Sequence, residues 1–332
     1  MQVSDGPSPV IKALPVRNDG KSKHTIISLD HVTHRYGQGG NASPALDDIS
    51  LDIEQGAFVG LIGRNGSGKT TLAKHLNGLI QPTQGIVTVD GLDVSKHSVG
   101  EMAAHVGFVF QNPDHQIFCS STKEEIAFGP TALGLDAATV FKRVDEMMTL
   151  FDLHRYEDVS PATLGYGERR AVALSSVIAM RTPILVLDEP TTGLDPQTRR
   201  TLWDVVAGLR RDRNMTVFLT THYMEEAADA DYVILLDSGR VVGEGTPLAL
   251  KNTYAGDHIT LYGVEEAAVR ALGRKYAPVQ GGWRIEVENT GEATKLILAQ
   301  PALFTDYEIT KGNMDDVFLA ATGKKLHGGA EV

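Results

Sequence analysis

The sequence has 332 residues, of which 42% are hydrophobic, and its formal net charge is -11 at pH 7. Length alone suggests about two domains, and the apolar fraction is sufficient for a buried core. The acidic balance argues against a general nucleic-acid binder, and the single cysteine, Cys119, excludes an internal disulfide and a thiolate metal cluster.

The sequence contains no apolar run of the roughly 20 residues needed to span a bilayer. The N-terminus also lacks the continuous apolar core of a secretory signal. Residues 1–24 mix Ser, Pro, Gly, Asp and Lys without any period, and we expect them to form a flexible tail. We therefore expect a soluble, intracellular protein; if it works at a membrane, a partner supplies the spanning part.

Strand-like segments at residues 25–29 and 45–53 precede the strongest motif in the chain. An apolar strand at residues 57–62 leads into Gly63-Arg64-Asn65-Gly66-Ser67-Gly68-Lys69-Thr70-Thr71, which fits G-x-x-x-x-G-K-[ST]. A helical pattern follows over residues 70–76, and Gly78 is well placed to end it. This order of strand, glycine loop and helix predicts a phosphate-binding loop, because its N–H groups and the helix dipole favour anions. Lys69 would reach the terminal phosphates, and the Thr70 hydroxyl would ligate Mg²⁺.

Short strands are then expected at residues 85–91 and 106–110, with Gln111 at the end of the second. Residues 122–180 carry apolar positions at three- and four-residue spacings and predict a helical insertion. A buried strand at 184–187, a helix capped by Asp195-Pro196, a strand at 217–222 and a hairpin over 232–242 follow. Strands that alternate with helices around a phosphate loop predict a mixed α/β core with a parallel central sheet.

The strand at 184–187 delivers two carboxylates, Asp188 and Glu189, to the sheet edge where the phosphate loop opens. Asp188 would hold Mg²⁺ through water, and Glu189 is placed to orient or deprotonate an attacking water. Taken alone, this segment could be an ordinary acidic turn. Beside the phosphate loop it predicts Mg²⁺-dependent hydrolysis of ATP or GTP.

Beyond about residue 255 the pattern changes to strands at 259–262, 283–287 and 307–309 and helices at 265–275, 293–298 and 315–321. We expect a tail over residues 1–24, an ATP-binding domain over 25–250 with a helical subdomain at about 112–180, and a small α+β domain over 251–332.

With these motifs in this order, the chain resembles ABC-type ATPases, the motor subunits of ATP-driven transporters. The resemblance implies a phosphate-loop core with a mixed central sheet, an antiparallel β subdomain and a helical subdomain. It implies that Gln111 contacts Mg²⁺ and water, that Gly193-Leu194-Asp195 touches a second subunit, and that His222 contacts the γ-phosphate. The matching position of Tyr36 implies stacking on adenine and favours ATP, although an isolated tyrosine near a strand end is more often a packing residue.

One motif departs from the family pattern Leu-Ser-Gly-Gly-Gln, which closes over the partner's ATP. Here the stretch is Leu164-Gly165-Tyr166-Gly167-Glu168, which lacks the serine hydroxyl and adds an aromatic ring and a negative charge. Either the variation is tolerated with activity intact, or this signature serves a weakened site in an asymmetric pair.

The stretch Phe110 to Phe118 and the segment Glu125 to Pro130 are similar to energy-coupling-factor ATPases, which drive uptake of vitamins and of cobalt or nickel ions. In contrast, Met314 to Leu319 resembles the tail of drug-export ATPases. We favour uptake, with an export ATPase and a non-transport ABC protein as alternatives. The resemblance implies transmembrane partner subunits, a second ATPase subunit, no nucleic acid, and a location at the cytoplasmic face of the cell membrane.

Overall fold

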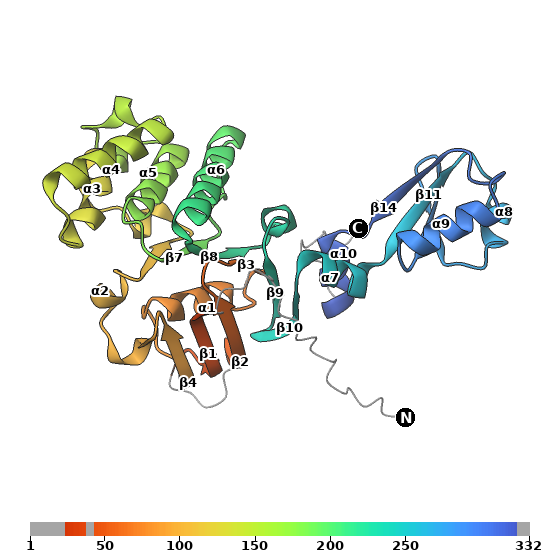
Figure 1. The fold of residues 1–332 in the computed structure, drawn as a ribbon, viewed down its shortest axis with the longest axis horizontal. Coiled ribbons are helices and arrows are strands. Elements are labelled where there is room, and N and C mark those ends of the chain that lie inside the picture. The colour runs from red at the N-terminus through yellow and green to blue at the C-terminus, as the bar shows by residue number, and fades with distance from the viewer. Residues whose placement is uncertain (1–23, 38–42, 324–332) are drawn as a thin grey trace. The chain divides into compact units, whose positions relative to one another are not determined.

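The computed structural model describes residues 24–37 and 43–323 (Figure 1). The predicted flexible tail therefore lies almost entirely outside the described residues. The chain divides between Val241 and Val242 into two compact units. Among the described residues, no helix combines the length and the apolar character needed to cross a bilayer.

The first unit contains a four-stranded antiparallel sheet in the order β2-β1-β4-β5. Its strands are β1 (Thr25–His34), β2 (Leu46–Glu54), β4 (Gln84–Val89) and β5 (Leu92–Asp93). From Ile49 onward, buried and more exposed positions alternate along β2, which is typical of a strand with one face on the core. Asp90 and Gly91 connect β4 to β5 with φ of 51° and 77°, the backbone that a two-residue hairpin requires.

A six-stranded sheet in the order β10-β9-β3-β8-β7-β6 forms the centre of this unit, and the division at Val241/Val242 falls within its edge strand β10. Its strands are β3 (Phe58–Gly63), β6 (Val106–Val109), β7 (Ile184–Asp188), β8 (Thr216–Thr221), β9 (Tyr232–Asp237) and β10 (Arg240–Gly245). The pairs β9–β3, β3–β8, β8–β7 and β7–β6 are parallel, which confirms the predicted parallel central sheet. Every residue of β3, β6, β7 and β8 is buried, as expected for parallel strands covered on both faces.

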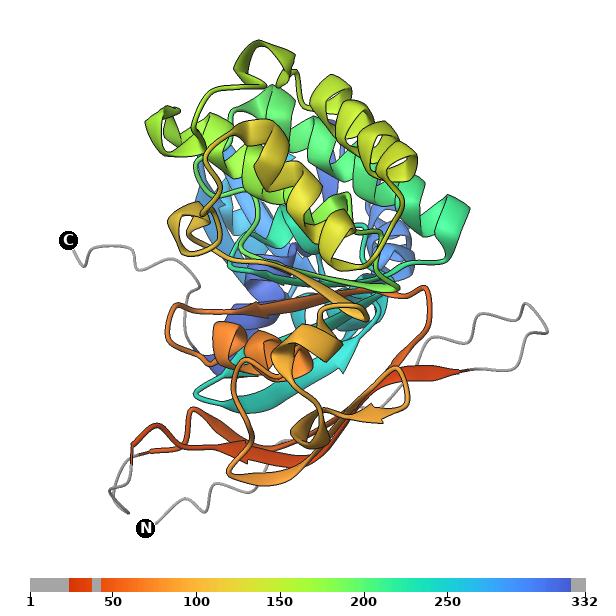
Figure 2. The same ribbon diagram turned by 90° about the vertical axis from the view of Figure 1, so that its left-hand side faces the viewer.

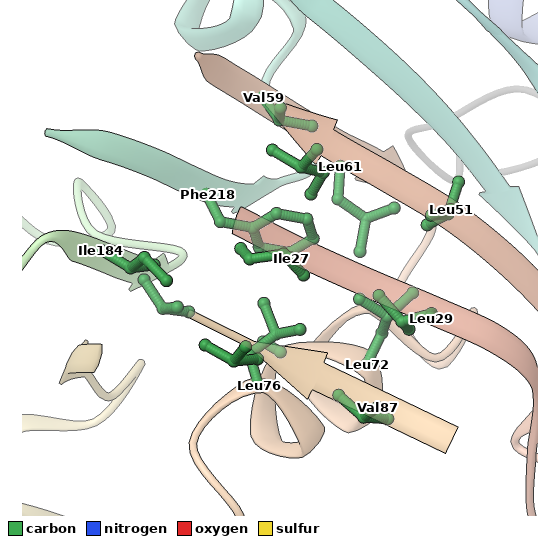
Figure 3. Packing of buried hydrophobic residues seen from close by; sticks show 14 of the residues in the cluster. Ile27, Leu29, Leu51, Val59, Leu61, Leu72, Leu76, Val87, Ile184 and Phe218 are labelled. Carbon is green, nitrogen blue, oxygen red and sulfur yellow. The ribbon is translucent and has the colours of Figure 1, made fainter. Parts of the chain in front are cut away.

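Helix α1 (Lys69–Leu76) contributes to one hydrophobic core with strands of both sheets (Figure 3). Leu72 and Leu76 of this helix share the core with Ile27 of the antiparallel sheet and with Leu61 and Phe218 of the central sheet. All five side chains are at most 1% exposed. The helix that follows the phosphate loop is therefore fixed by packing on two sides.

The predicted helical insertion is present and lies on the other side of the central sheet from α1 (Figure 2). The helices of this insertion are α3 (Thr122–Ala132), α4 (Ala137–Leu150) and α5 (Tyr166–Ile178). Helix α2 (Val99–Met102) precedes β6, and helix α6 (Pro196–Arg213) follows β7. Asp195 caps α6 as expected, because its carboxylate accepts from the N–H groups of Gln197 and Thr198. Helix α5 is buried along most of its length, from Arg170 to Ile178.

The second unit is a β-α-β-β-α-β arrangement with its own core. Its elements are β11 (Asp257–Tyr262), α8 (Glu266–Arg270), β12 (Tyr276–Val279), β13 (Gly282–Val287), α9 (Thr290–Ala299) and β14 (Tyr307–Lys311). The antiparallel order β12-β13-β11-β14 is that of a ferredoxin-like split βαβ. Helix α7 (Pro247–Leu250), the π-helical turn η6 (Lys251–Ala255) and α10 (Met314–Thr322) contact one another in the same unit.

Two details of this unit differ from the sequence expectation. The helix expected over residues 265–275 ends at Arg270, and Gly273 beyond it takes a φ of 65° that a helix cannot continue. Strand β12 was not expected, because Pro278 interrupts its short apolar pattern. The strand lies at the sheet edge, where a proline is tolerated.

Candidate active site

The phosphate loop connects β3 to α1 and is shaped by glycines. Gly66 and Gly68 adopt φ of 80° and 109°, and a Cβ at Gly63 would lie 2.5 Å from Ser67 Oγ. Lys69 is 5% exposed, and its ammonium donates to the carbonyl of Gly63 at 2.9 Å. The Ser67 hydroxyl is buried and has no partner among the described residues. This orphaned hydroxyl, the buried ammonium and the open glycine backbone fit a triphosphate.

Asp188, at the end of β7, lies against the first turn of α1. The Thr70 hydroxyl donates to Asp188 Oδ1 at 3.1 Å, and the Thr220 hydroxyl of β8 donates to the same oxygen at 2.5 Å. Burial raises the pKa of Asp188, while the hydrogen bonds from Thr220 and Thr70 oppose that change. A carboxylate beside a hydroxyl supplies the hard oxygen ligands that Mg²⁺ prefers, so these two residues fit the ion.

Glu189 is the residue on which the site converges. Gln111 Nε2 donates to Glu189 Oε2 at 2.7 Å, and Lys69 Nζ and His222 Nδ1 each lie 3.3 Å from Oε1. These three residues come from the end of β6, the start of α1 and the end of β8, which the parallel strands bring to one edge. The Glu189 side chain is 7% exposed, so it faces these groups with little competing water.

The backbone of Glu189 is also constrained. Its φ is 45°, in the left-handed region that glutamate rarely adopts. Its N–H donates to the carbonyl of Thr220 at 3.0 Å, which fixes the turn that leaves β7. Strained backbone of this kind is found where the surroundings hold a functional group in place.

Tyr36 and Asn65 lie at the outer side of the loop. The Tyr36 hydroxyl is 3.1 Å from Thr71 Oγ1, and its ring packs edge-on against His34. The Tyr36 side chain remains 56% exposed, so an aromatic face is open beside the phosphate loop. Asn65 is exposed as well.

The divergent signature stretch contacts its own chain. Gly165 caps α5 without a side-chain hydrogen bond, and a Cβ there would lie 2.4 Å from the carboxylate of Glu168. The ring of Tyr166 lies against Gly193, where a Cβ would come within 2.4 Å of the tyrosine Cε1. The signature stretch and the Gly193-Leu194-Asp195 loop are therefore in direct contact.

Sequence reasoning missed three residues of this region. Thr220 holds Asp188, Arg170 contacts the backbone on both sides of Glu189, and Glu226 accepts from the hydroxyls of Thr191 and Thr221. Burial raises the pKa of Glu226, whereas the two hydroxyl donors lower it. For Arg170 a signal exists in the sequence, because a charged residue precedes an otherwise small and apolar helical run.

Comparison with known proteins agrees with this geometry. Residues 46–192 match the ABC transporter family. The energy-coupling factor transporter ATP-binding protein EcfA1 of Caldanaerobacter subterraneus subsp. tengcongensis is 44% identical over 225 residues, which cover 67% of this chain and 81% of that protein.

Two solved structures are similar, each with 27% identity. One is CbiO1 of Clostridium perfringens, part of the ABC transporter complex CbiONQ, with a TM-score of 0.59 over 68% of this chain and 90% of that chain. The other is a dimeric post-hydrolysis ATP-binding cassette bound to ADP and Pi, with a TM-score of 0.62 over 66% of this chain and 98% of that chain. The chain therefore belongs to the ATP-binding proteins of energy-coupling factor transporters, a family of ABC ATPases.

Proposed function

We propose that this ABC ATPase hydrolyses ATP at the edge where β3, β6, β7 and β8 end, with Glu189 as the general base. The convergence of Lys69, Gln111 and His222 on one buried carboxylate is the observation that carries the proposal. A carboxylate at the centre of such a set is within reach of a water that faces the terminal phosphate.

In the proposed reaction, Lys69 and the loop amides hold the phosphates while Gln111 and His222 orient the water. The water oxygen bonds to the γ-phosphorus as the bond to the bridging oxygen of ADP breaks, and the water proton passes to Glu189. ADP and phosphate leave, and the proton returns to solvent. Thr70, Asp188 and Gln111 would hold Mg²⁺, which neutralises phosphate charge when bound. Tyr36 is placed to stack on the base, and Gly63, Asn65, Gly66, Ser67, Gly68 and Thr71 complete the proposed nucleotide contacts.

We also propose an ATP-binding domain over residues 25–250 and a small α+β domain over 251–332, whereas the two compact units divide nine residues earlier, between Val241 and Val242. In the helical subdomain of the ATP-binding domain, three exposed aromatic side chains could contact a membrane subunit. Phe118 and Phe128 form an edge-to-face pair at 4.7 Å, and Phe141 is 64% exposed beside an apolar groove of about 330 Å³. Exposed apolar patches of this kind mark protein–protein contacts. The protein would then lie at the cytoplasmic face of the membrane through its partners.

The transported substrate proposed is a vitamin or a metal ion, taken up rather than exported. The names of the relatives, energy-coupling factor transporter ATP-binding proteins, support the uptake class. The tail segment that resembled export ATPases is α10, a capped helix whose Met314, Val317 and Phe318 are buried. Packing therefore accounts for its apolar pattern. Purification of the native complex and identification of the membrane subunits that accompany it would test the substrate class.

The catalytic assignment is tested by Glu189→Gln in the assembled complex. The amide cannot accept the proton, so ATP turnover should fall by about 10²–10⁴-fold while ATP stays bound and the ATPase dimer is stabilised. Glu225→Gln is the matched control, because that side chain is exposed on a neighbouring segment. Unchanged turnover in Glu189→Gln would reject the role of Glu189.

A further inference from the structure

Arg170, on α5, is a fully buried cation whose donors are all used. The side chain is 0% exposed, and an arginine has five N–H donors. Each of them has a main-chain carbonyl as acceptor. Nε donates to Pro190 at 3.0 Å, Nη2 to Glu189 at 2.7 Å and to Asp188 at 3.3 Å, and Nη1 to Gln111 at 2.5 Å and to Phe110.

These carbonyls belong to two strand ends that the sheet itself does not hold together. The last paired residues of β6 and β7 are Val109 and Leu187. Gln111 and Glu189, the two residues that meet in the active site, lie two positions beyond that pair. Beyond the last paired residues of β6 and β7, the guanidinium of Arg170 connects the two strand ends by its hydrogen bonds to their carbonyls.

The connection is rigid because the guanidinium is planar and its donors point in fixed directions. Burial lowers the pKa of Arg170, and the negative charges around it, including Asp188 and Glu189, raise it. The group stays protonated, since arginine does not lose its proton in proteins. A shorter or uncharged side chain would leave several buried carbonyls without a donor.

We propose that Arg170 is a positioning residue that sets the spacing between Gln111 and Glu189 and makes that spacing depend on the position of α5. The inference rests on the proposed function, in which these two residues act together on the attacking water. It predicts that a change at Arg170 alters the chemical step while the phosphate loop, which Arg170 does not touch, still binds ATP.

The test compares Arg170→Lys and Arg170→Gln with wild type in the assembled complex. Loss of orientation should lower kcat by about 10–100-fold while KM for ATP changes by less than about threefold. Lysine keeps the charge and three donors, so its kcat should lie between those of wild type and glutamine. Arg143→Gln is the matched control, because Arg143 also donates to two main-chain carbonyls, those of Ala179 and Met180, away from the site. Its kcat should stay within about twofold of wild type.

A second measurement separates positioning from general damage to the fold. If Arg170 acts through Glu189, the double variant Arg170→Lys/Glu189→Gln should be no slower than Glu189→Gln alone. Additive losses, a wild-type kcat in Arg170→Gln, or equal losses in the Arg143 control would overturn the inference. Absence of ATPase activity in the wild-type complex would instead reject the proposed function.

Discussion

The contact between Tyr166 and Gly193 gives a stability prediction that can be worked from the structure. Gly193 has a φ of 77°, and a Cβ there would lie 2.4 Å from Tyr166 Cε1. Alanine at a left-handed position costs about 1–2 kcal/mol of unfolding free energy. The clash adds about 1–3 kcal/mol of overpacking, nearer the lower end because the 40% exposed ring can swing outward. Gly193→Ala should therefore cost about 2–4 kcal/mol in total.

Gly134 is the control that isolates the backbone cost. It has the same φ of 77°, but a Cβ there would meet no atom within 4 Å. Gly134→Ala should cost only the backbone part, about 1–2 kcal/mol. In a Tyr166→Ala background the ring is gone, so Gly193→Ala should cost no more than Gly134→Ala.

The double-mutant cycle consists of wild type, Gly193→Ala, Tyr166→Ala and the double variant. Chemical denaturation of these four proteins measures the coupling energy between the two positions, provided that the denaturant dependence m is unchanged. We expect a coupling of about 1–2 kcal/mol, which reports the contact between the signature stretch and the neighbouring loop. A coupling below about 0.5 kcal/mol, with Gly193→Ala equal to Gly134→Ala, would refute the reasoning.

Three further predictions concern pH, turnover and assembly. Burial lowers the pKa of His75 from 6.5 to about 4. As pH falls, the unfolded chain therefore binds a proton at His75 before the folded chain does. About 3 kcal/mol of unfolding free energy that is present above pH 6.5 should be lost as pH falls towards 4. Chemical denaturation across this pH range should show that the unfolding free energy of His75→Gln depends less on pH than that of wild type. The same slope in both proteins would contradict the lowered pKa of His75. Joint replacement of Gly165→Ser, Tyr166→Gly and Glu168→Gln should raise ATP turnover of the complex by up to about 100-fold; no rise would reject a weakened signature. Phe141→Asp should reduce co-purification of the membrane subunit by about tenfold with ATP affinity unchanged, and undiminished recovery would exclude this surface.

Much of the first unit could be predicted from the sequence because its signals are local. The apolar run before Gly63, the glycines of the loop and the carboxylates after Leu187 each lie within a few residues of one another. Parallel strands then bring the ends of distant segments to one edge, so Gln111 and His222 follow from the fold once the strands are assigned.

The contacts of Arg170 could not be predicted in this way. Its acceptors are main-chain carbonyls, which every residue type carries, so no pattern of side chains identifies them. The same holds for Tyr166 and Gly193, whose contact depends on the path of two loops. In the second unit, β12 was missed because an edge strand needs little apolar patterning, and Pro278 masks what remains.

The position of β3 has a consequence for hydrogen exchange. The strand pairs with β8 over Phe58–Ile62 and with β9 over Val59–Gly63, and all of its residues are buried. Its amides should exchange with deuterium only when the whole unit opens, at the slow limit set by global unfolding. The phosphate loop is thus tethered, on the side where it begins, to the slowest-exchanging part of the unit. The motions of a catalytic cycle must then come from the segments that pack around it, and the amides of these segments should exchange sooner.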